Sequence, residues 1–239
     1  MKFYTLTTFP EIIDFYMSES IMGRAVKKGL IESVSINIRD YSLDKHHSTD
    51  DYPYGGGAGM IMQVQPVYDA WKAAYEKASG DSEGKPVRTV YFTAQGRTFN
   101  ESIAKEYSTE ESIILLCGHY EGIDERVIEE IAPDEISMGD FILTGGELPA
   151  LTFMDAVSRL IPSVLHNDDS ASDESFENDL LEYPQYSRPE IWHERKVPEI
   201  LLSGDHAKVD AWRRDQAIER TKKRRPDLYE KFIRNSNNT

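Results

Sequence analysis

The sequence predicts an α/β fold whose sheet is mostly parallel. Over the first 160 residues, short segments rich in β-branched and aromatic residues alternate with longer segments of helical spacing. The run Ser112–Cys117 is almost wholly apolar, which is typical of a strand buried on both faces. Regular alternation of strands and helices along a chain is the pattern of an α/β domain.

Each element has its own local signal. The predicted strands are Lys2–Thr7, Val34–Ile38, Val87–Thr93 and Ser112–Cys117. The predicted helices are Pro10–Lys28, Val64–Ala78, Asp124–Ile131 and Glu147–Leu160. Pro10 suits a first helical turn, Gly29 a helix stop and Asp124 an N-cap. The segments Tyr54–Met60, Ala94–Arg97 and Met138–Pro149 interrupt this rhythm, and we expect loops there, where α/β folds usually carry their sites.

Charge is distributed unevenly along the chain. The 239 residues carry a formal net charge of −15, which by itself argues against a nucleic-acid partner. From Ala207 to Thr239, however, ten Lys and Arg face five acids. This basic end of an acidic chain indicates either a nucleic-acid contact or a solvated helix face. The sequence shows no signal peptide, no apolar stretch of membrane-spanning length and a single cysteine, Cys117, so we expect a cytoplasmic protein with a buried, unreactive thiol.

The composition also predicts the domain organisation. We expect an α/β domain over residues 1–161, an acidic flexible linker over 162–182 and a small helical domain over 183–239. The linker prediction rests on seven acids without Lys or Arg between Pro162 and Glu182. Helices are expected near Ala207–Arg220 and Pro226–Ile233.

Several familiar ligand motifs are absent. The segment YGGGAGM at 54–60 lacks the Gly-Lys-Ser/Thr of a phosphate-binding loop, and it lacks the GxGxxG of a dinucleotide site. No Cys/His cluster has zinc spacing, and the adjacent His46 and His47 are predicted to be surface or loop residues. We therefore predict no metal site from the residues, although a requirement for divalent magnesium stays open.

Five motifs occur in a fixed order: YGGGAGM, CGHYEGIDERV, SMGDFILTGGELPAL, DAVSRLIPSVL and LLEYPQYSRPEIW. With them, the chain from Phe3 to about Leu228 resembles the bacterial tRNA (guanine-N1)-methyltransferases of the SPOUT class. The resemblance implies a parallel sheet with a deep trefoil knot, S-adenosylmethionine as methyl donor and a homodimer whose active sites are shared between protomers. It also implies methylation at N1 of guanine 37 in tRNA, just 3′ of the anticodon.

By this resemblance, the cofactor site lies in the strand-end loops. Backbone amides of the 138–143 segment could hold an adenine edge, and Glu121 could accept a hydrogen bond from a ribose hydroxyl. One departure is Ala94, where many relatives have proline. The predicted cofactor-binding residues are Tyr91, Gln95, Gly96, Gly118, Tyr120, Glu121, Ser137, Met138, Gly139, Asp140, Phe141, Ile142, Leu143, Gly145, Gly146 and Pro149.

The reaction would need a base for the N1 proton and a donor for charge that develops on O6. Arg159 matches the family's catalytic arginine, and alignment on Ser-Phe places Glu174 at the position of the base, with Asp173 as the alternative. Tyr183, Tyr186 and Trp192 could stack on bases or belong to the core. The predicted tRNA-binding residues are Arg213, Arg214, Arg220, Arg224 and Arg225. The competing hypotheses are a ribose 2′-O-methyltransferase of the same class and a non-catalytic RNA-binding module.

Overall fold

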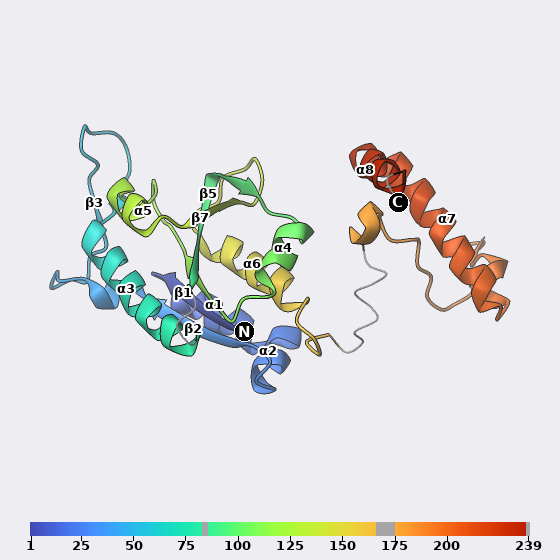
Figure 1. The fold of residues 1–239 in the computed structure, drawn as a ribbon, viewed down its shortest axis with the longest axis horizontal. Coiled ribbons are helices and arrows are strands. Elements are labelled where there is room, and N and C mark those ends of the chain that lie inside the picture. The colour runs from blue at the N-terminus through green and yellow to red at the C-terminus, as the bar shows by residue number, and fades with distance from the viewer. Residues whose placement is uncertain (83–85, 166–174, 238–239) are drawn as a thin grey trace. The chain divides into compact units, whose positions relative to one another are not determined.

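The computed structural model describes residues 1–82, 86–165 and 175–237 of the chain (Figure 1). The chain divides into two compact units, Met1–His166 (unit 1) and Asn167–Thr239 (unit 2). Each is described by itself. Among the described residues, no helix is both long enough and apolar enough to cross a membrane.

Unit 1 is built on a five-stranded sheet with the order β2-β1-β6-β5-β7. Its neighbouring strands all pair in parallel, as the sequence predicts. The strands are β1 (Lys2–Thr7), β2 (Glu32–Asn37), β5 (Arg88–Thr98), β6 (Ser112–Leu116) and β7 (Asp134–Ser137). Every residue of the central strand β6 is buried, which confirms the interpretation of its apolar run. A separate two-stranded ladder joins β3 (Asp50–Asp51) to β4 (Ile61–Met62).

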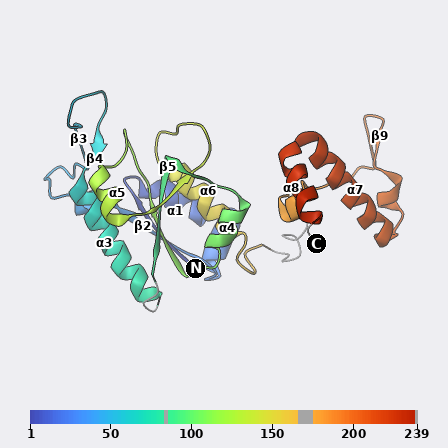
Figure 2. The same ribbon diagram turned by 45° about the horizontal axis from the view of Figure 1, so that its top comes forward.

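Helices cover both faces of this sheet (Figure 2). One buried cluster joins the sheet to α1 (Pro10–Ser18), α2 (Ser20–Lys27), α4 (Glu101–Tyr107) and α6 (Glu147–Ser158). The second cluster lies on the opposite face, under α3 (Val64–Asp81) and α5 (Glu125–Ile131). The predicted cap is confirmed, because the Asp124 side chain accepts a hydrogen bond from the Arg126 amide. The resulting order of layers is helix, sheet, helix, with α1 and α6 on one side and α3 on the other.

The single helix predicted over Pro10–Lys28 is wrong, because the chain breaks between α1 and α2. Glu19 is extended and Ser20 has a φ of +50°. At Gly23, a Cβ would lie 2.0 Å from the Ser18 carbonyl oxygen. The second helix therefore packs back against the end of the first so closely that only glycine fits at the contact. The predicted stop is confirmed at Gly29, which has a φ of +70°.

The third predicted strand is longer than expected and irregular. Phe92 and Arg97 of β5 both pair with Ile136 of β7, so residues 93–96 leave the ladder between them. The predicted loop at Ala94–Arg97 thus lies within the strand rather than after it. The sequence analysis also missed α4, although its N-cap Asn100 accepts a hydrogen bond from the Ile103 amide.

Unit 2 has few regular elements besides two helices. These are α7 (His206–Arg224) and α8 (Pro226–Ser236), close to the predicted positions. A hairpin of β8 (Ile191–Trp192) and β9 (Arg195–Lys196) precedes them, together with the short turns η3 (Glu177–Asp179) and η4 (Glu199–Leu202). The Leu181 amide donates to Thr221 of α7, and Asp179 accepts from Lys231 and Asn235 of α8. Residues 175–182 are therefore bonded to the two helices that follow them.

Candidate active site

Three loops of unit 1 meet at the carboxyl ends of three adjacent strands of its sheet. They follow Phe92 of β5, the end of β6 and the end of β7. Between them lies a pocket of about 210 Å³. The carboxyl edge of a parallel sheet is the usual place for a ligand site in an α/β fold. The pocket is lined by Tyr91, Phe92, Thr93, Ala94, Gly118, His119, Tyr120, Glu121, Gly122, Ile136, Ser137, Met138, Gly139, Phe141, Ile142, Leu143, Thr144, Gly145, Gly146 and Pro149.

Most of the predicted cofactor residues line this pocket. Gln95, Gly96 and Asp140 are the exceptions. They belong to the same loops but do not line the pocket. The lining adds residues that the sequence analysis did not name, among them Phe92, Thr93, His119 and Thr144. His119 and Thr144 belong to two of the five motifs, whereas Phe92 and Thr93 belong to a predicted strand without a motif. The convergence of the three loops brings these residues to the same pocket.

Glycines in the lining and beside it have a packing role. A Cβ on Gly146 would lie 2.5 Å from the Cys117 Cα, and one on Gly145 would lie 2.3 Å from the His119 ring. Likewise, a Cβ on Gly96 would lie 2.3 Å from the Glu135 carbonyl carbon. At Gly146 and Gly96 the backbones cross with no room for a side chain, whereas at Gly145 the space is filled by the side chains of the buried polar pair beside it. The Gly146 amide donates to the Gly118 carbonyl at 2.9 Å, which joins two of the three loops.

A buried polar cluster supports the same junction. Glu147, the first residue of α6, is 4% exposed. Its carboxylate accepts from Thr7 at the end of β1, and it lies 2.7 Å from Nε2 of His119. Burial acts to raise the pKa of Glu147, but the hydrogen bonds from His119 and Thr7 outweigh burial and leave this pKa below its usual value. The cluster ties β1, the loop after β6 and α6 together behind the pocket.

Charge in the pocket is sparse. The described lining contains no Lys or Arg, and Glu121 is its one acidic residue. The Glu121 carboxylate also lies over the glycine-rich loop, since a Cβ on Gly59 would meet its Cγ and Oε1 at 2.6 Å. The segment 54–60 therefore reaches the pocket through Glu121. A site with this lining suits a ligand without phosphate groups.

A buried thiol beside the pocket and a partly buried phenol in its lining are chemically quiet. Burial raises the pKa of the Cys117 thiol well above its usual value, so the thiol stays protonated, in agreement with the sequence analysis. Burial also raises the pKa of Tyr91. His46 and His47 are exposed loop residues as predicted. Among the described residues, no group of three or more His, Cys, Asp or Glu is placed to hold a metal ion.

The predicted catalytic residues do not meet at the pocket within the described part of the chain. Arg159 is exposed and caps the carboxyl end of α6, whereas Pro149 at the other end of that helix lines the pocket. These two residues are ten positions apart, about 15 Å along a helix axis. Glu174 and Asp173 lie outside the described residues.

The predicted tRNA-binding arginines of unit 2 fall into two groups. Arg220 donates to the Glu182 carbonyl, Arg225 pairs with Asp227, and Arg213 pairs with Asp210 and lies over the Tyr183 ring. The side chains of Arg214 and Arg224 are exposed and form no hydrogen bond or ion pair with another described residue. Trp192 is 61% exposed, whereas Tyr186 lies near Trp212.

Together, the fold and the pocket define an α/β protein with a pocket at the end of a parallel sheet, followed by a helical unit rich in arginine. The model of the family described as tRNA (Guanine-1)-methyltransferase TrmD matches residues 1–231. The chain therefore belongs to this family, in agreement with the resemblance drawn from its motifs.

Curated relatives agree over the whole length. The chain is 56% identical over 232 residues to a tRNA (guanine-N(1)-)-methyltransferase of Ruminiclostridium cellulolyticum, covering 97% of both chains. It is 54% identical over 231 residues to the protein of the same name from Clostridioides difficile, covering 97% of this chain and 98% of the relative. The protein of that name from Lachnospira eligens is 50% identical over 234 residues, covering 98% and 97%.

Proposed function

We propose that this protein transfers a methyl group from S-adenosylmethionine to N1 of guanine 37 in tRNA. The observation that carries the proposal is the pocket at the carboxyl edge of the sheet, in a chain of the tRNA (guanine-1)-methyltransferase family. The methylation of guanine N1 in tRNA follows from the family, and the position along the tRNA follows from the motif resemblance. The family resemblance also implies a trefoil knot, and this stays a prediction.

The residues of the pocket fit S-adenosylmethionine. This ligand has an adenine, a ribose and a cationic sulfonium but no phosphate, and the described lining offers aromatic rings and backbone groups but no Lys or Arg side chain. Glu121 supplies one carboxylate for a ribose hydroxyl or a positive charge. Tyr91, Phe92 and Phe141 offer apolar surface for a purine ring. When bound, the cofactor supplies an electrophilic methyl group.

The chain would supply the proton chemistry. Guanine N1 carries a proton, so a base must accept it as N1 forms its bond to the methyl carbon. Glu174 is our candidate for this base, with Asp173 as the alternative. Arg159 is our candidate donor for the negative charge on O6, because a guanidinium can hold an oxyanion as the charge develops.

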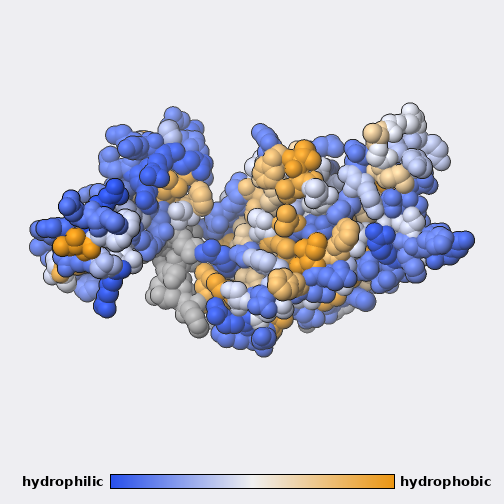
Figure 3. Space-filling model, turned by 180° about the vertical axis from the view of Figure 1, so that it is seen from behind, coloured by the Kyte–Doolittle hydropathy of each residue, from blue (hydrophilic) through white to orange (hydrophobic). Residues whose placement is uncertain are grey.

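We further propose that the active site is completed by a second copy of the chain. Arg159 lies about 15 Å of helix away from the pocket of its own protomer. Figure 3 shows hydrophobic side chains gathered over one face of unit 1. Exposed apolar residues of unit 1 lie on α1, in the loop before α6 and at the start of α6: Ile12, Phe15, Phe141, Ile142, Leu143 and Leu148. An apolar surface of this kind is typical of an interface with a partner.

Unit 2 would hold the tRNA backbone. On α7, the side chains of Arg214, Lys222, Lys223 and Arg224 are exposed and form no ion pair with another described residue. Phosphate contacts by such side chains provide affinity and register rather than sequence readout. The domain assignment of the sequence analysis, with the RNA-binding part over 183–239, is part of this proposal.

The decisive experiment is mass spectrometry of tRNA after incubation with the protein and S-adenosylmethionine. We expect one added methyl group at N1 of guanine 37. A methyl group on a ribose 2′-hydroxyl would support the alternative enzyme, and binding without any methylation would support a non-catalytic RNA-binding module. Light scattering at micromolar concentration tests the dimer, and a monomer would contradict a shared site.

Single-turnover rates test the choice of base. Glu174→Gln keeps the shape of the side chain but removes its basicity, so we expect methyl transfer to slow by about 10²- to 10⁴-fold. Asp173→Asn is the matched control and should react at nearly the parent rate. The opposite result, with only Asp173→Asn impaired, would assign the role to Asp173.

A further inference from the structure

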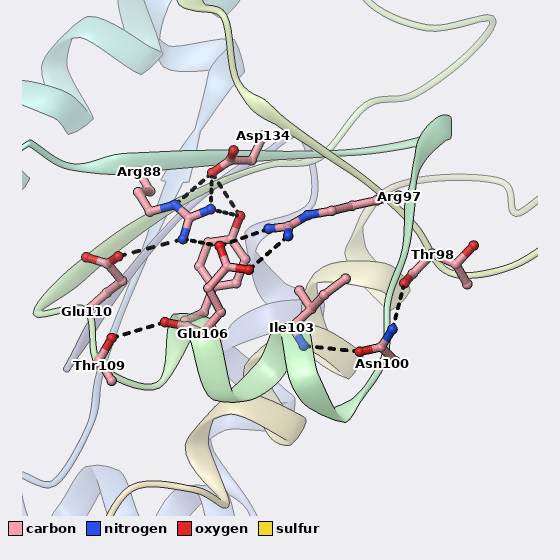
Figure 4. Close-up of polar contacts among 10 residues, drawn as sticks. Arg88, Arg97, Thr98, Asn100, Ile103, Glu106, Thr109, Glu110 and Asp134 are labelled. Carbon is pink, nitrogen blue, oxygen red and sulfur yellow. Dashed lines mark hydrogen bonds and ion pairs between the residues drawn. The ribbon is translucent and has the colours of Figure 1, made fainter. Parts of the chain in front are cut away.

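A polar cluster beside β5 is not explained by the proposed reaction. It contains Arg88 and Arg97 of β5, Glu106 and Tyr107 of α4, and Asp134 of β7, and we call it the Arg88–Glu106 cluster (Figure 4). None of these five residues lines the pocket. The cluster nevertheless includes residues of β5 on both sides of residues 93–96, which form part of one wall of the pocket.

Glu106 is shared by the two arginines. Its carboxylate accepts two hydrogen bonds from Arg97, at 2.8 and 3.0 Å, and pairs with Nη1 of Arg88 at 2.7 Å. These pairs bring the pKa of Glu106 down to about 2. A two-pronged contact between a guanidinium and a carboxylate fixes geometry as well as charge. One carboxylate therefore holds two cationic side chains in a defined arrangement.

This sharing depends on an interruption in β5, whose two parts both pair in parallel with β7 but are separated by looped-out residues. Arg88 and Arg97 are nine positions apart, which in a straight strand would be about 30 Å. In β5 the register is interrupted, since Phe92 and Arg97 both pair with Ile136. Residues 93–96 are looped out, and the two ends of the strand approach the same helix. Glu106 lies where it can tie those ends together.

The looped-out residues form part of the pocket. Thr93 and Ala94 belong to its lining, and Tyr91 and Phe92 line it from the strand just before the loop. After the loop, Gly96 passes the backbone of β7 so closely that a Cβ would lie 2.3 Å from the Glu135 carbonyl carbon. The position of this wall therefore depends on how closely the two ends of the loop are held.

The anchor for the loop is rigid. Tyr107, next to Glu106 in α4, is fully buried and packs against Phe153 with ring centroids 5.0 Å apart. Its hydroxyl donates to Asp134 at 2.8 Å, and the Arg88 guanidinium lies 3.9 Å from its ring centroid. Because Glu106 is adjacent to Tyr107, which is fixed in the core, its own backbone is fixed. Its carboxylate can therefore hold Arg88 and Arg97 on either side of the loop in place.

We propose that Glu106 is a positioning residue of the cofactor pocket: by holding Arg88 and Arg97 together, it keeps residues 93–96 in the conformation that binds the cofactor. The proposal rests on the proposed function, because it takes the pocket to be the S-adenosylmethionine site. Glu106 touches neither the pocket nor the reacting atoms, so its effect is confined to cofactor binding. The loss of its charge should loosen one wall of the pocket while the other two loops stay joined.

The test compares two neighbouring carboxylates. Glu106→Gln removes the shared charge, whereas Glu110→Gln removes only a 3.8 Å pair with Arg88. We expect Glu106→Gln to weaken calorimetric binding of S-adenosylmethionine by about three- to fivefold, the upper part of the range of a partly exposed ion pair. Glu110→Gln should change it by less than about twofold. In turnover, Glu106→Gln should raise KM for S-adenosylmethionine and leave kcat and KM for tRNA near the parent values.

Hydrogen exchange of the ligand-free protein provides a second readout that does not depend on the cofactor. Glu106→Gln should speed exchange of the amides at 93–98 and leave β6 unchanged, and Glu110→Gln should leave both unchanged. If Glu106→Gln exchanges and binds like the parent protein, Glu106 is not a positioning residue. If the parent protein does not bind S-adenosylmethionine but Glu106→Gln still speeds exchange at 93–98, the proposed function is contradicted. The role of Glu106 in holding residues 93–96 is then still supported.

The charge-conserving variant Arg97→Lys covers the case in which Glu106→Gln fails to fold. It keeps the positive charge and loses the two-pronged contact, so its cofactor affinity and loop exchange should lie between those of the parent protein and those expected for Glu106→Gln. Parent-like values for Arg97→Lys would overturn the proposal.

Discussion

Different kinds of interaction stabilise the two units of the chain. Unit 1 buries large side chains on both faces of its sheet, including Phe3, Leu6 and Phe153. Among the described residues of unit 2, the buried apolar side chains are Val209 and Ala217. Unit 2 relies instead on polar contacts such as Asp179 with Lys231 and Leu181 with Thr221.

This difference determines how each unit can present a site. In unit 1, close packing fixes the loops at the end of the sheet, so a defined pocket can exist before any ligand arrives. In unit 2, exposed arginines occupy a helix with little core beneath it, which suits contacts to an extended charged partner. Substitutions in unit 1 should therefore act mainly through packing, and substitutions in unit 2 mainly through charge.

The largest expected effect comes from the tightest backbone crossing in the pocket. Gly146→Ala places a Cβ 2.5 Å from the Cys117 Cα, and this contact involves backbone that has no room to move. We expect a loss of about 3 kcal/mol in the free energy of unfolding, which corresponds to about 6–12 °C in Tm for a unit of this size. Thermal melting followed by circular dichroism measures it.

Gly118→Ala is the matched control for that crossing. Its Cβ would meet the Tyr91 ring at 3.1 Å, and a side chain can shift. We expect a loss of no more than about 1 kcal/mol in stability, combined with weaker binding of S-adenosylmethionine. Equal losses of stability for both variants would show that packing at the crossing is not the limiting feature of unit 1.

The sequence predicted elements that carry a local signal. The strand Lys2–Thr7 and the Asp124 cap are confirmed because a few neighbouring residues determine them. The break between α1 and α2 was not predictable, because it depends on Gly23 packing against Ser18. The hairpin at 191–196 was missed for a similar reason: its turn residues His193 and Glu194 have φ of +46° and +62°, without the Asn-Gly signal of such turns.

The same limit applies to the site. Two of the three loops lie within motifs that are continuous in the chain, and the third was indicated by the Ala94–Arg97 segment, which interrupts the alternation of strands and helices. The cluster of Thr7, His119 and Glu147 joins residues up to 140 positions apart, and no pattern in the sequence connects them. The role of Glu106 likewise depends on the fold of β5, which brings together two arginines that a regular strand would separate.

The next largest effect is expected at the buried cluster of Thr7, His119 and Glu147, and it depends on pH. The folded state holds the pKa of Glu147 below the usual 4.5, so the carboxylate contributes stability above that pH and loses it as the pH falls through the folded-state pKa. Glu147→Gln should cost about 1–3 kcal/mol at pH 7, because it weakens the contact with His119 in a buried position. The difference from the parent protein should shrink below about pH 4.5.

Urea unfolding at a series of pH values measures that difference. Glu129→Gln, on the exposed face of α5, removes a carboxylate without a buried partner and should leave the stability profile within about 0.5 kcal/mol of the parent. If the Glu147→Gln difference is as large at pH 3 as at pH 7, the charge of Glu147 is not what stabilises the cluster.

The smallest expected effect belongs to unit 2, and it separates the two groups of arginines there. Arg214 and Arg224 form no ion pair with another described residue, so replacing both with Gln should leave folding intact. If each contacts one phosphate, the slope of log affinity for tRNA against log salt should flatten by about 1.4–1.8. The control is Lys72→Gln with Lys77→Gln on α3 of unit 1, which removes the same charge and should leave the slope unchanged.

Arg220→Ala should instead lower stability, because Arg220 donates a hydrogen bond to the Glu182 carbonyl. An unchanged slope for the Arg214 and Arg224 double variant would mean that unit 2 holds tRNA through other groups, and that its excess of positive charge is a solvated helix face.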